Sequence, residues 1–434
     1  MELRRLKALS LLGRGAKGIA FLVKDEESSD RTLALKVISK ALIEKKRKNS
    51  EKAPKKIDSS DHRDHTMKRI WFERDVLSLL DHPLLPKLRG LVVTDEIVSF
   101  AMDYCPGGNL NNLRKQQTEK MFSEDLIRFY AAEIVIALEY LHGLGIVYRD
   151  LKPENILIQE NGHLMVVDFD LSTKLISSKI TRQSLKPDAE INNNTNVNTK
   201  MKKKKKSKRF SCLSLHRAGV SPVDSSTESK VAELAKRPME RSNSFVGTEE
   251  YVSPEIISGT GHDSAVDRWG LGVVIYEMLY GRTPFRGSNR SETFYRILTK
   301  EPELVGDRTA LRDLIRKLLE KDPEKRISME EIKGHEFFKG VAWDSVVRIS
   351  RPPYIPPPQI WEEDVEGIKG IDVEAYVKEA CESFDNEEGQ NGNCDDKIGG
   401  KWDHKKATQT QSYKKDVWRI GLSSPIKTSE FSVF

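Results

Sequence analysis

The sequence is poor in the features that mark secreted proteins, membrane-spanning proteins and proteins stabilised by a structural metal ion. It has only four cysteines in 434 residues, and their wide spacing matches neither a disulfide framework nor a zinc site. No apolar run approaches the roughly 18–20 residues that cross a bilayer, and the first residues lack the apolar core of a secretory signal. Neither a myristoylation nor a prenylation motif is present. We therefore expect an intracellular protein of a reducing compartment, without a transmembrane segment.

Aromatic residues are also scarce, at 7% of the chain, and two long stretches are especially polar. Residues from about 176 to 240 and from about 360 to 434 are rich in polar and charged side chains. Each stretch buries too little apolar surface to offset the entropy of ordering its backbone. The mild net charge of +6 hides basic runs at about 44–64 and 200–209 and an acidic run before residue 396. We expect these stretches to lie outside the folded core.

The rest of the sequence predicts an α+β fold with two lobes. In the first hundred residues, short strand-like runs surround one helix whose apolar residues recur at helical spacing. Most later segments are helical, including one that begins at the capping residue Ser123 and stops at Gly143 and Gly145. We place a small sheet-rich lobe at 1–102, a larger helical lobe at 103–338 and a C-terminal tail at 339–434 that starts with a proline-rich strap.

A glycine-rich segment near the N-terminus has the spacing of a phosphate-binding loop. "LGRGAKGIAFLV" places Gly13, Gly15 and Gly18 between two strand-like runs, where glycines allow a triphosphate to approach the backbone N–H groups. This pattern alone is weak, because a structural turn can have the same glycines. The strand-like "LALK" that follows places Lys36 to hold the α- and β-phosphates, and Glu73 lies in the helix at the register of its partner.

The segment "YRDLKPEN" is the most specific signal in the chain. At this spacing Asp150 can accept the hydrogen bond of a substrate hydroxyl, and Lys152 can neutralise a transferring phosphoryl group. Asn155 can bind one Mg²⁺ ion, and Asp168, thirteen residues later, can bind the other. Lysine at position 152 is typical of kinases that phosphorylate serine and threonine.

"SNSFVGTEEYVSPE" follows the long basic insert and has the pattern of an activation segment. Ser244 is placed to be phosphorylated, and Arg149 of the catalytic segment is a candidate partner for that phosphate. We expect Thr248 to lie next to Asp150 and Lys152. A structural ion pair between Glu255 and Arg326 is also expected.

With these motifs together, the chain resembles a protein kinase of the AGC group, and within it the plant AGC VIII serine/threonine kinases. The resemblance is carried by Asp-Phe-Asp at 168–170 in place of the usual Asp-Phe-Gly, the long basic insert, "RSNSFVGTEEYVSPE" and a terminal Phe-x-x-Phe. "LLGRGAKG", "DYCPGGNLNNLRK" and "FRGSNRSETFYRIL" are most similar to the oxidative-signal-inducible kinase branch. The resemblance covers about residues 5–358 outside the inserts, and the last four residues.

The resemblance implies a two-lobed protein kinase fold and the phosphorylation of protein serine and threonine with ATP and Mg²⁺, in plant stress or growth signalling. It also implies a nucleotide pocket with Met102 as gatekeeper. The other residues that it assigns to this pocket are Ala20, Ala34, Asp103, Cys105 and Leu157. The hydrophobic stack that links the two lobes would consist of Leu77, Leu88, Tyr148 and Phe169.

The resemblance further implies partners for the site and for the tail. Glu154 and Glu277 match two positions that read arginines in substrates, whereas Asn109 replaces the third acidic residue. For substrate selection, an arginine two residues before the phosphorylated serine or threonine should therefore matter more than an arginine three residues before it. Phe431 and Phe434 match a motif that docks on an upstream phosphoinositide-dependent kinase. We expect a monomer.

Two competing interpretations remain open from the sequence. Asp170, Ala20 and Asn109 favour a pseudokinase scaffold, although every residue expected for catalysis is present. The run "KMKKKKKSKRF" fits nuclear targeting, a solvated charge run, or attraction to an anionic phospholipid surface at about 1 kcal/mol per basic residue. No aromatic stacking module accompanies it, so we expect no specific nucleic acid. The expected location is cytoplasmic, with the nucleus and the plasma-membrane surface as further candidates.

Overall fold

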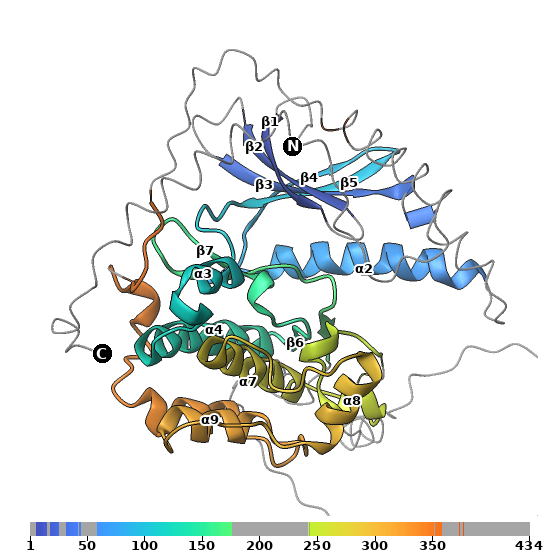
Figure 1. Cartoon of the computed structure of the whole chain (residues 1–434). Coiled ribbons are helices and arrows are strands. Elements are labelled where there is room, and N and C mark those ends of the chain that lie inside the picture. The colour runs from blue at the N-terminus through green and yellow to red at the C-terminus, as the bar shows by residue number, and fades with distance from the viewer. Residues whose placement is uncertain are drawn as a thin grey trace, which may run out of the picture. The chain divides into compact units, whose positions relative to one another are not determined.

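The computed structural model describes residues 6–14, 18–25, 32–41, 43–44, 59–175, 242, 244–350, 352–357, 373 and 376. All of these except residue 175 belong to one structural unit. Within it, Figure 1 shows a β-sheet, one long helix beneath the sheet and a group of helices on the other side of that helix. This is the order of sheet and helices that the sequence predicts.

The small lobe is a five-stranded antiparallel sheet in the order β1-β2-β3-β5-β4. Residues alternate between its two faces, as Leu33, Leu35 and Val37 show by being buried while Ala34 and Lys36 are half-buried. The bounds are β1 Leu6–Arg14, β2 Gly18–Asp25, β3 Thr32–Ser39, β4 Leu88–Val93 and β5 Ile97–Asp103. Because β3 lies in the centre, Lys36 is held between two neighbouring strands.

Helix α2, Ser59–Leu79, is the long helix beneath the sheet in Figure 1. Its apolar stripe includes Ile70, Val76 and Leu77, all buried in the larger core cluster. Glu73 lies on the same stripe and is also buried, at 2% exposure. A carboxylate among apolar residues is costly unless it has a partner, so this position itself points to a pairing.

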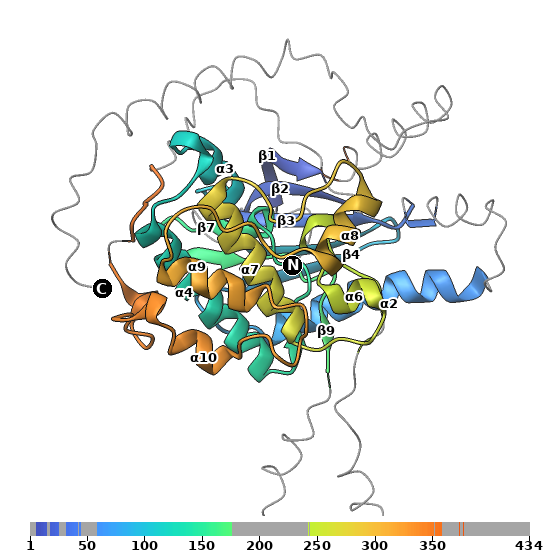
Figure 2. The same cartoon turned by 60° about the horizontal axis from the view of Figure 1, so that its bottom comes forward.

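The large lobe consists mainly of helices, which Figure 2 brings to the front. Helix α4 begins after Ser123, whose side chain accepts the Leu126 N–H, and it carries Glu124 and Asp125 in its first turn. The helices are α3 Leu110–Gln116, α4 Glu124–Gly143, α6 Pro254–Ser258, α7 Ala265–Tyr280, α8 Arg290–Thr299, α9 Ala310–Leu318 and α10 Met329–Lys333. The short strands are β6 Ile146–Val147, β7 Ile156–Ile158, β8 Leu164–Val166 and β9 Thr173–Lys174. Helix α7 is buried on nearly all sides and forms the centre of this lobe.

Residues 352–357 pack along the large lobe and lead toward the connection between the lobes. Gly162, at φ +86°, faces the Tyr354 carbonyl, and a Cβ atom there would lie 2.2 Å from that oxygen. A Cβ atom on Gly107 would lie 2.7 Å from Pro356. Further along the tail, Tyr376 packs edge-on against Phe21 of β2 with ring centroids 5.4 Å apart. Within the described segments of the chain, no helix is long and apolar enough to cross a membrane.

Candidate active site

Lys36 connects the two lobes through two carboxylates. Its Nζ lies 2.6 Å from Glu73 Oε1 on α2 and 2.8 Å from Asp168 Oδ1, which follows β8. Burial acts to lower the pKa of Lys36, but the two carboxylates outweigh it and hold the pKa above its ordinary value. The pKa of Asp168 is below its ordinary value because Lys36 and Lys152 outweigh the effect of burial. Both groups are therefore charged at neutral pH.

The catalytic segment forms a closed hydrogen-bonded set around Asp150. Lys152 Nζ lies 2.6 Å from Asp150 Oδ2, and Asn155 Nδ2 donates to the same oxygen at 2.9 Å. Thr248 Oγ1, from the activation segment, donates to Asp150 Oδ1 at 2.9 Å and accepts from Lys152 Nζ at 2.9 Å. Residues 98 positions apart in sequence thus meet at one carboxylate.

The backbone of this segment is anchored by Asp267 at the start of α7. Its carboxylate accepts the N–H of Tyr148 at 2.9 Å and of Arg149 at 2.7 Å, and it also contacts His142 Nε2 at 2.7 Å. Arg149 has a left-handed backbone, with φ at 70°. Asp267 is completely buried, so it holds this strained turn from beneath the site.

The Asp-Phe-Asp turn also has a left-handed backbone at its first residue. Asp168 has φ at 65°, whereas Asp170 is not among the non-glycine residues of the described segments with positive φ. Phe169 is buried and contacts Tyr148 edge-on, with ring centroids 5.4 Å apart. The Asp170 carbonyl accepts from Arg69 Nε at 3.2 Å and from Nη2 at 2.6 Å. Leu77 is buried in the same core cluster, and Leu88 is half-buried against it. The interlobe stack of these four residues stays a prediction.

Several of the residues expected to surround adenine lie on neighbouring strands of the five-stranded sheet. Ala34 pairs with Met102 across β3 and β5, and Ala20 pairs with Lys36 across β2 and β3. Leu157 lies on β7 in the large lobe, opposite Met165. Cys105 is buried, with Sγ 3.6 Å from Met165 Sδ, and burial raises the pKa of its thiol to about 12. Gly13 lies one residue before the end of β1 at Arg14, and Gly15 lies outside the described residues.

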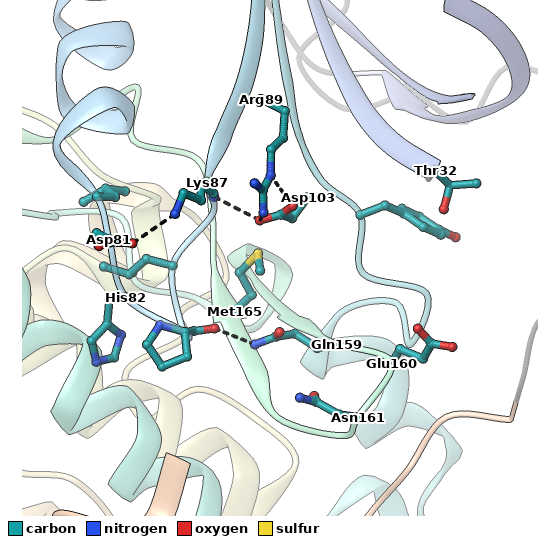
Figure 3. Close-up of a pocket in the computed structure, with 14 residues that line it drawn as sticks. Thr32, Asp81, His82, Lys87, Arg89, Asp103, Gln159, Glu160, Asn161 and Met165 are labelled. Carbon is teal, nitrogen blue, oxygen red and sulfur yellow. Dashed lines mark hydrogen bonds and ion pairs between the residues drawn. The ribbon is translucent and has the colours of Figure 1, made fainter. Parts of the chain in front are cut away.

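A cavity of about 770 Å³ lies beside the connection between the lobes. Asp103 lines it, but none of the residues expected for phosphoryl transfer does. Figure 3 shows Lys87 pointing toward Asp81, and Arg89 toward Asp103. Lys87 Nζ lies 3.1 Å from Asp81 Oδ1, and Arg89 Nε lies 2.8 Å from Asp103 Oδ1. The Asp103 carboxylate therefore pairs with β4, which the sequence did not suggest.

The two acidic residues expected to read substrate arginines have different surroundings. Glu154 is exposed and accepts from Asn111 Nδ2 at 2.7 Å. Glu277 is buried; its Oε1 lies 3.0 Å from Arg114 Nη2, and it also accepts from the Tyr251 hydroxyl. Asn109 caps α3 by accepting the Asn112 N–H, which gives this departure from the family pattern a structural role.

Ser244 lies in an exposed part of the activation segment, next to Arg149. Arg149 Nη1 donates to Ser244 Oγ at 2.7 Å. The expected ion pair between Glu255 and Arg326 is present, at 2.7 Å and fully buried on the arginine side. Phe431, Phe434 and the basic run at 200–209 lie outside the described residues.

Sequence reasoning missed Arg69, Arg114 and His262. Arg69 precedes Glu73 by one helical turn and so lies on the same face of α2, a signal that could have found it. Arg114 and His262 meet partners more than a hundred positions away, and no local pattern marks them.

Comparison with known proteins identifies the family. The model of the protein kinase domain family matches residues 6–187 and 229–338, which is well over half of the chain. The chain belongs to the protein kinase family. It is 52% identical over 420 residues to serine/threonine-protein kinase OXI1 of Arabidopsis thaliana, with 93% of each chain covered. It is 44% identical to serine/threonine-protein kinase UCN of the same plant, over 82% of this chain and 85% of that protein.

A third Arabidopsis thaliana relative, serine/threonine-protein kinase AGC1-5, is 40% identical over 82% of this chain and 60% of its own length. The kinase is thus a serine/threonine protein kinase of the plant AGC VIII type, as the sequence motifs predict. The comparisons give the pseudokinase interpretation no support. The sheet-rich and helical lobes of the structure are the two lobes of the kinase fold.

Proposed function

We propose that the kinase binds ATP between its lobes and that each residue described above has its own role in phosphoryl transfer. Gly13, Gly15 and Gly18 would approach the phosphates, and Lys36 would hold the α- and β-phosphates. Adenine would lie between Ala20, Ala34 and Leu157, below Met102. The Asp103 carbonyl and the Cys105 N–H would bond its edge. The single observation that carries this proposal is that Lys36 lies within 2.8 Å of both Glu73 and Asp168.

The side chains near the expected phosphate position suit a Mg²⁺ ion that also binds phosphate oxygens of the nucleotide. No group of three or more acidic, histidine or cysteine side chains forms a metal cluster in the described part of the chain, and Mg²⁺ in kinases needs only one or two protein ligands besides phosphate oxygens. Asp168 is ionised and 44% exposed, so it faces solvent. Asn155 uses its amide N–H groups on Asp150, which leaves its oxygen as a ligand atom. The ion would neutralise charge on the phosphates.

Asp150 would then accept a hydrogen bond from the substrate hydroxyl and orient the hydroxyl oxygen for in-line attack. Lys152 would stabilise negative charge on the transferring group, and Thr248 would hold both side chains. The test is an assay with Mg²⁺, [γ-³²P]ATP and a basic protein substrate. We expect Asp168→Ala to abolish labelling and the surface variant Glu139→Ala to leave it unchanged. Equal labelling by wild type and Asp168→Ala would overturn the proposal.

We also propose that phosphorylation of Ser244 activates the kinase. Support comes from the 2.7 Å contact between Ser244 Oγ and Arg149, which belongs to the catalytic segment. The upstream enzyme would be a phosphoinositide-dependent kinase that docks on Phe431 and Phe434. Ser244→Ala should prevent activation by that enzyme, and Phe431→Ala should slow the phosphorylation of Ser244 without changing the activity of protein that is already phosphorylated. Full activation of Ser244→Ala would contradict this regulation.

Substrate selection would depend on Glu154 and Glu277. Glu154 is exposed and bonds to the neutral amide of Asn111, whereas Glu277 is already countered by the charge of Arg114. We therefore expect Glu154→Ala to weaken the preference for arginine two residues before the target more than Glu277→Gln does. Peptides with arginine or alanine at that position measure the preference as a ratio of kcat/KM values.

The setting would be plant stress or growth signalling, by a monomer that acts without specific nucleic acid. The basic run at 200–209 would attract an anionic phospholipid surface or address the nucleus. Sedimentation with vesicles of phosphatidylserine and phosphatidylcholine, compared with phosphatidylcholine alone, tests the first alternative. Binding that does not depend on the anionic lipid would exclude it.

A further inference from the structure

His262 lies in the loop before α7 and is attached to the activation segment by its backbone. The Ser242 N–H donates to the His262 carbonyl at 3.0 Å, and the His262 N–H donates to the Ser242 carbonyl at 2.9 Å. The residue is only 3% exposed. This two-bonded bridge holds the backbone of His262 against the stretch that ends in Ser244, and burial restricts the ring.

The imidazole shares one arginine nitrogen with the two serines. Arg149 Nη1 lies 2.7 Å from Ser244 Oγ, 3.1 Å from Ser242 Oγ and 3.2 Å from His262 Nε2. An arginine can only donate. His262 Nε2 therefore accepts in this state, and the neutral imidazole carries its proton on Nδ1.

The charges around His262 agree with a neutral ring. Burial and the neighbouring Arg149 lower the pKa of His262, and nearby carboxylates oppose them only in part. Those carboxylates already have partners, because Glu255 pairs with Arg326 and Asp267 accepts two backbone N–H groups. The charged groups that face the ring are Arg149 of the catalytic segment, Glu255 of α6, Asp263 of the same loop and Asp267 of α7.

A phosphate on Ser244 would need more donors than Arg149 can give. Arg149 Nε already donates to the Leu171 carbonyl at 2.7 Å, and Nη2 to the Ser172 carbonyl at 3.3 Å. Only Nη1 faces the serines. A phosphoserine has three strong acceptor oxygens and carries nearly two negative charges at neutral pH. Another donor within reach is His262 Nε2, provided that it is protonated.

We propose that His262 is a binding residue for the Ser244 phosphate: when Ser244 is phosphorylated, the ring takes up one proton from solvent and donates from Nε2 to a phosphate oxygen. Arg149 Nη1 then turns from the imidazole to the phosphate as well. This inference rests on the proposed phosphorylation of Ser244 and adds that the activated state binds one proton more than the inactive state. Activation is consequently stronger at low pH than at high pH.

The direct test is the protonation of His262 measured by NMR on ¹⁵N-histidine-labelled full-length kinase, with His262→Gln used to assign the signal. An opposite charge at this range raises a histidine pKa by about one to three pH units, so we expect that increase when Ser244 is phosphorylated. The same treatment of Ser244→Ala should leave the signal unchanged. A His262 titration that is identical before and after stoichiometric phosphorylation would overturn the inference.

The functional test compares phosphorylated wild type with phosphorylated His262→Gln between pH 6.5 and 8.5. Glutamine can still bond to its neighbours but cannot take up a proton. We expect the ratio of phosphorylated to unphosphorylated activity to fall with rising pH in wild type and to stay level in His262→Gln. His335→Gln alters a different buried histidine, which pairs with Asp313 of α9 at 3.0 Å. It is the matched control and should behave as wild type.

The two proposals fail in distinguishable ways. If mass spectrometry finds no phosphate on Ser244 after activation, the proposed regulation is wrong. If Ser244 is phosphorylated and the kinase is activated, but wild type and His262→Gln have the same pH profile, only the role of His262 is wrong.

Discussion

Thr248 offers a sharp test of how the activation segment supports catalysis, because one hydroxyl touches both central residues. Its Oγ1 donates to Asp150 at 2.9 Å and accepts from Lys152 at 2.9 Å. We predict that Thr248→Val, which keeps the shape of the side chain and removes the hydroxyl, lowers kcat. Thr248→Ser keeps the hydroxyl and serves as the matched control.

The size of the effect follows from the local bonding. A hydrogen bond to a charged group contributes about 1.5–3 kcal/mol. Two such bonds are lost, but Asp150 and Lys152 also bond to each other at 2.6 Å, so they can partly compensate. Counting one bond gives a decrease in kcat of about 10- to 150-fold. The serine variant loses one methyl group, worth about 0.8 kcal/mol, and should stay within about fourfold of wild type.

Initial rates with [γ-³²P]ATP and a basic protein substrate measure both variants. The KM for ATP should change little, because Thr248 bonds to Asp150 and Lys152 and not to Lys36. Thermal unfolding of each variant checks that the fold is intact. A valine variant within threefold of wild type, or a serine variant as impaired as valine, would refute the reasoning.

Three further predictions concern stability and loop dynamics. Glu255→Gln, in a pair that is almost fully buried, should lower the free energy of unfolding in urea by about 3–5 kcal/mol. Glu139→Gln, in an exposed pair, should cost less than about 1 kcal/mol, and equal costs would contradict this contrast. Although burial lowers the pKa of His163, Glu133 outweighs this effect and raises that pKa above its ordinary value. The pair should therefore stabilise the fold fully below about pH 6.5, and this stabilisation should be lost as pH rises through the raised pKa. Urea midpoints from pH 6 to 9 should therefore decline more steeply in wild type than in His163→Gln. Asp170→Gly should keep kcat within about threefold and increase hydrogen exchange in its loop about two- to fivefold; complete loss of activity would contradict it.

The catalytic segment was predictable because its chemistry is local. Asp150, Lys152 and Asn155 lie within six positions of one another, so a turn alone brings them together. Lys36 and Glu73 were predictable for a different reason, since the sheet and α2 follow from periodicity and a buried charge on each needs a partner.

The surroundings of these residues were not predictable in the same way. Arg114 bonds to the Gly281 carbonyl 167 positions away, and Arg149 contacts His262 113 positions away. Arginine side chains at such positions are also common on solvated surfaces. Only the packing of α3, α7 and the activation segment decides which of them are enclosed, and no spacing in a single sequence encodes that packing.

Asp170 is a residue whose interpretation from the sequence is changed by the structure. Glycine at this position is expected to supply backbone freedom, so its replacement by aspartate suggests either lost function or a locked loop. In the structure the strained backbone belongs to Asp168, with φ at 65°, and Asp170 adopts no positive φ. Its anchor to α2 is a carbonyl bonded to Arg69, which glycine would also provide. The aspartate therefore needs no strained backbone in this arrangement, and we expect it to make other arrangements of the loop less accessible.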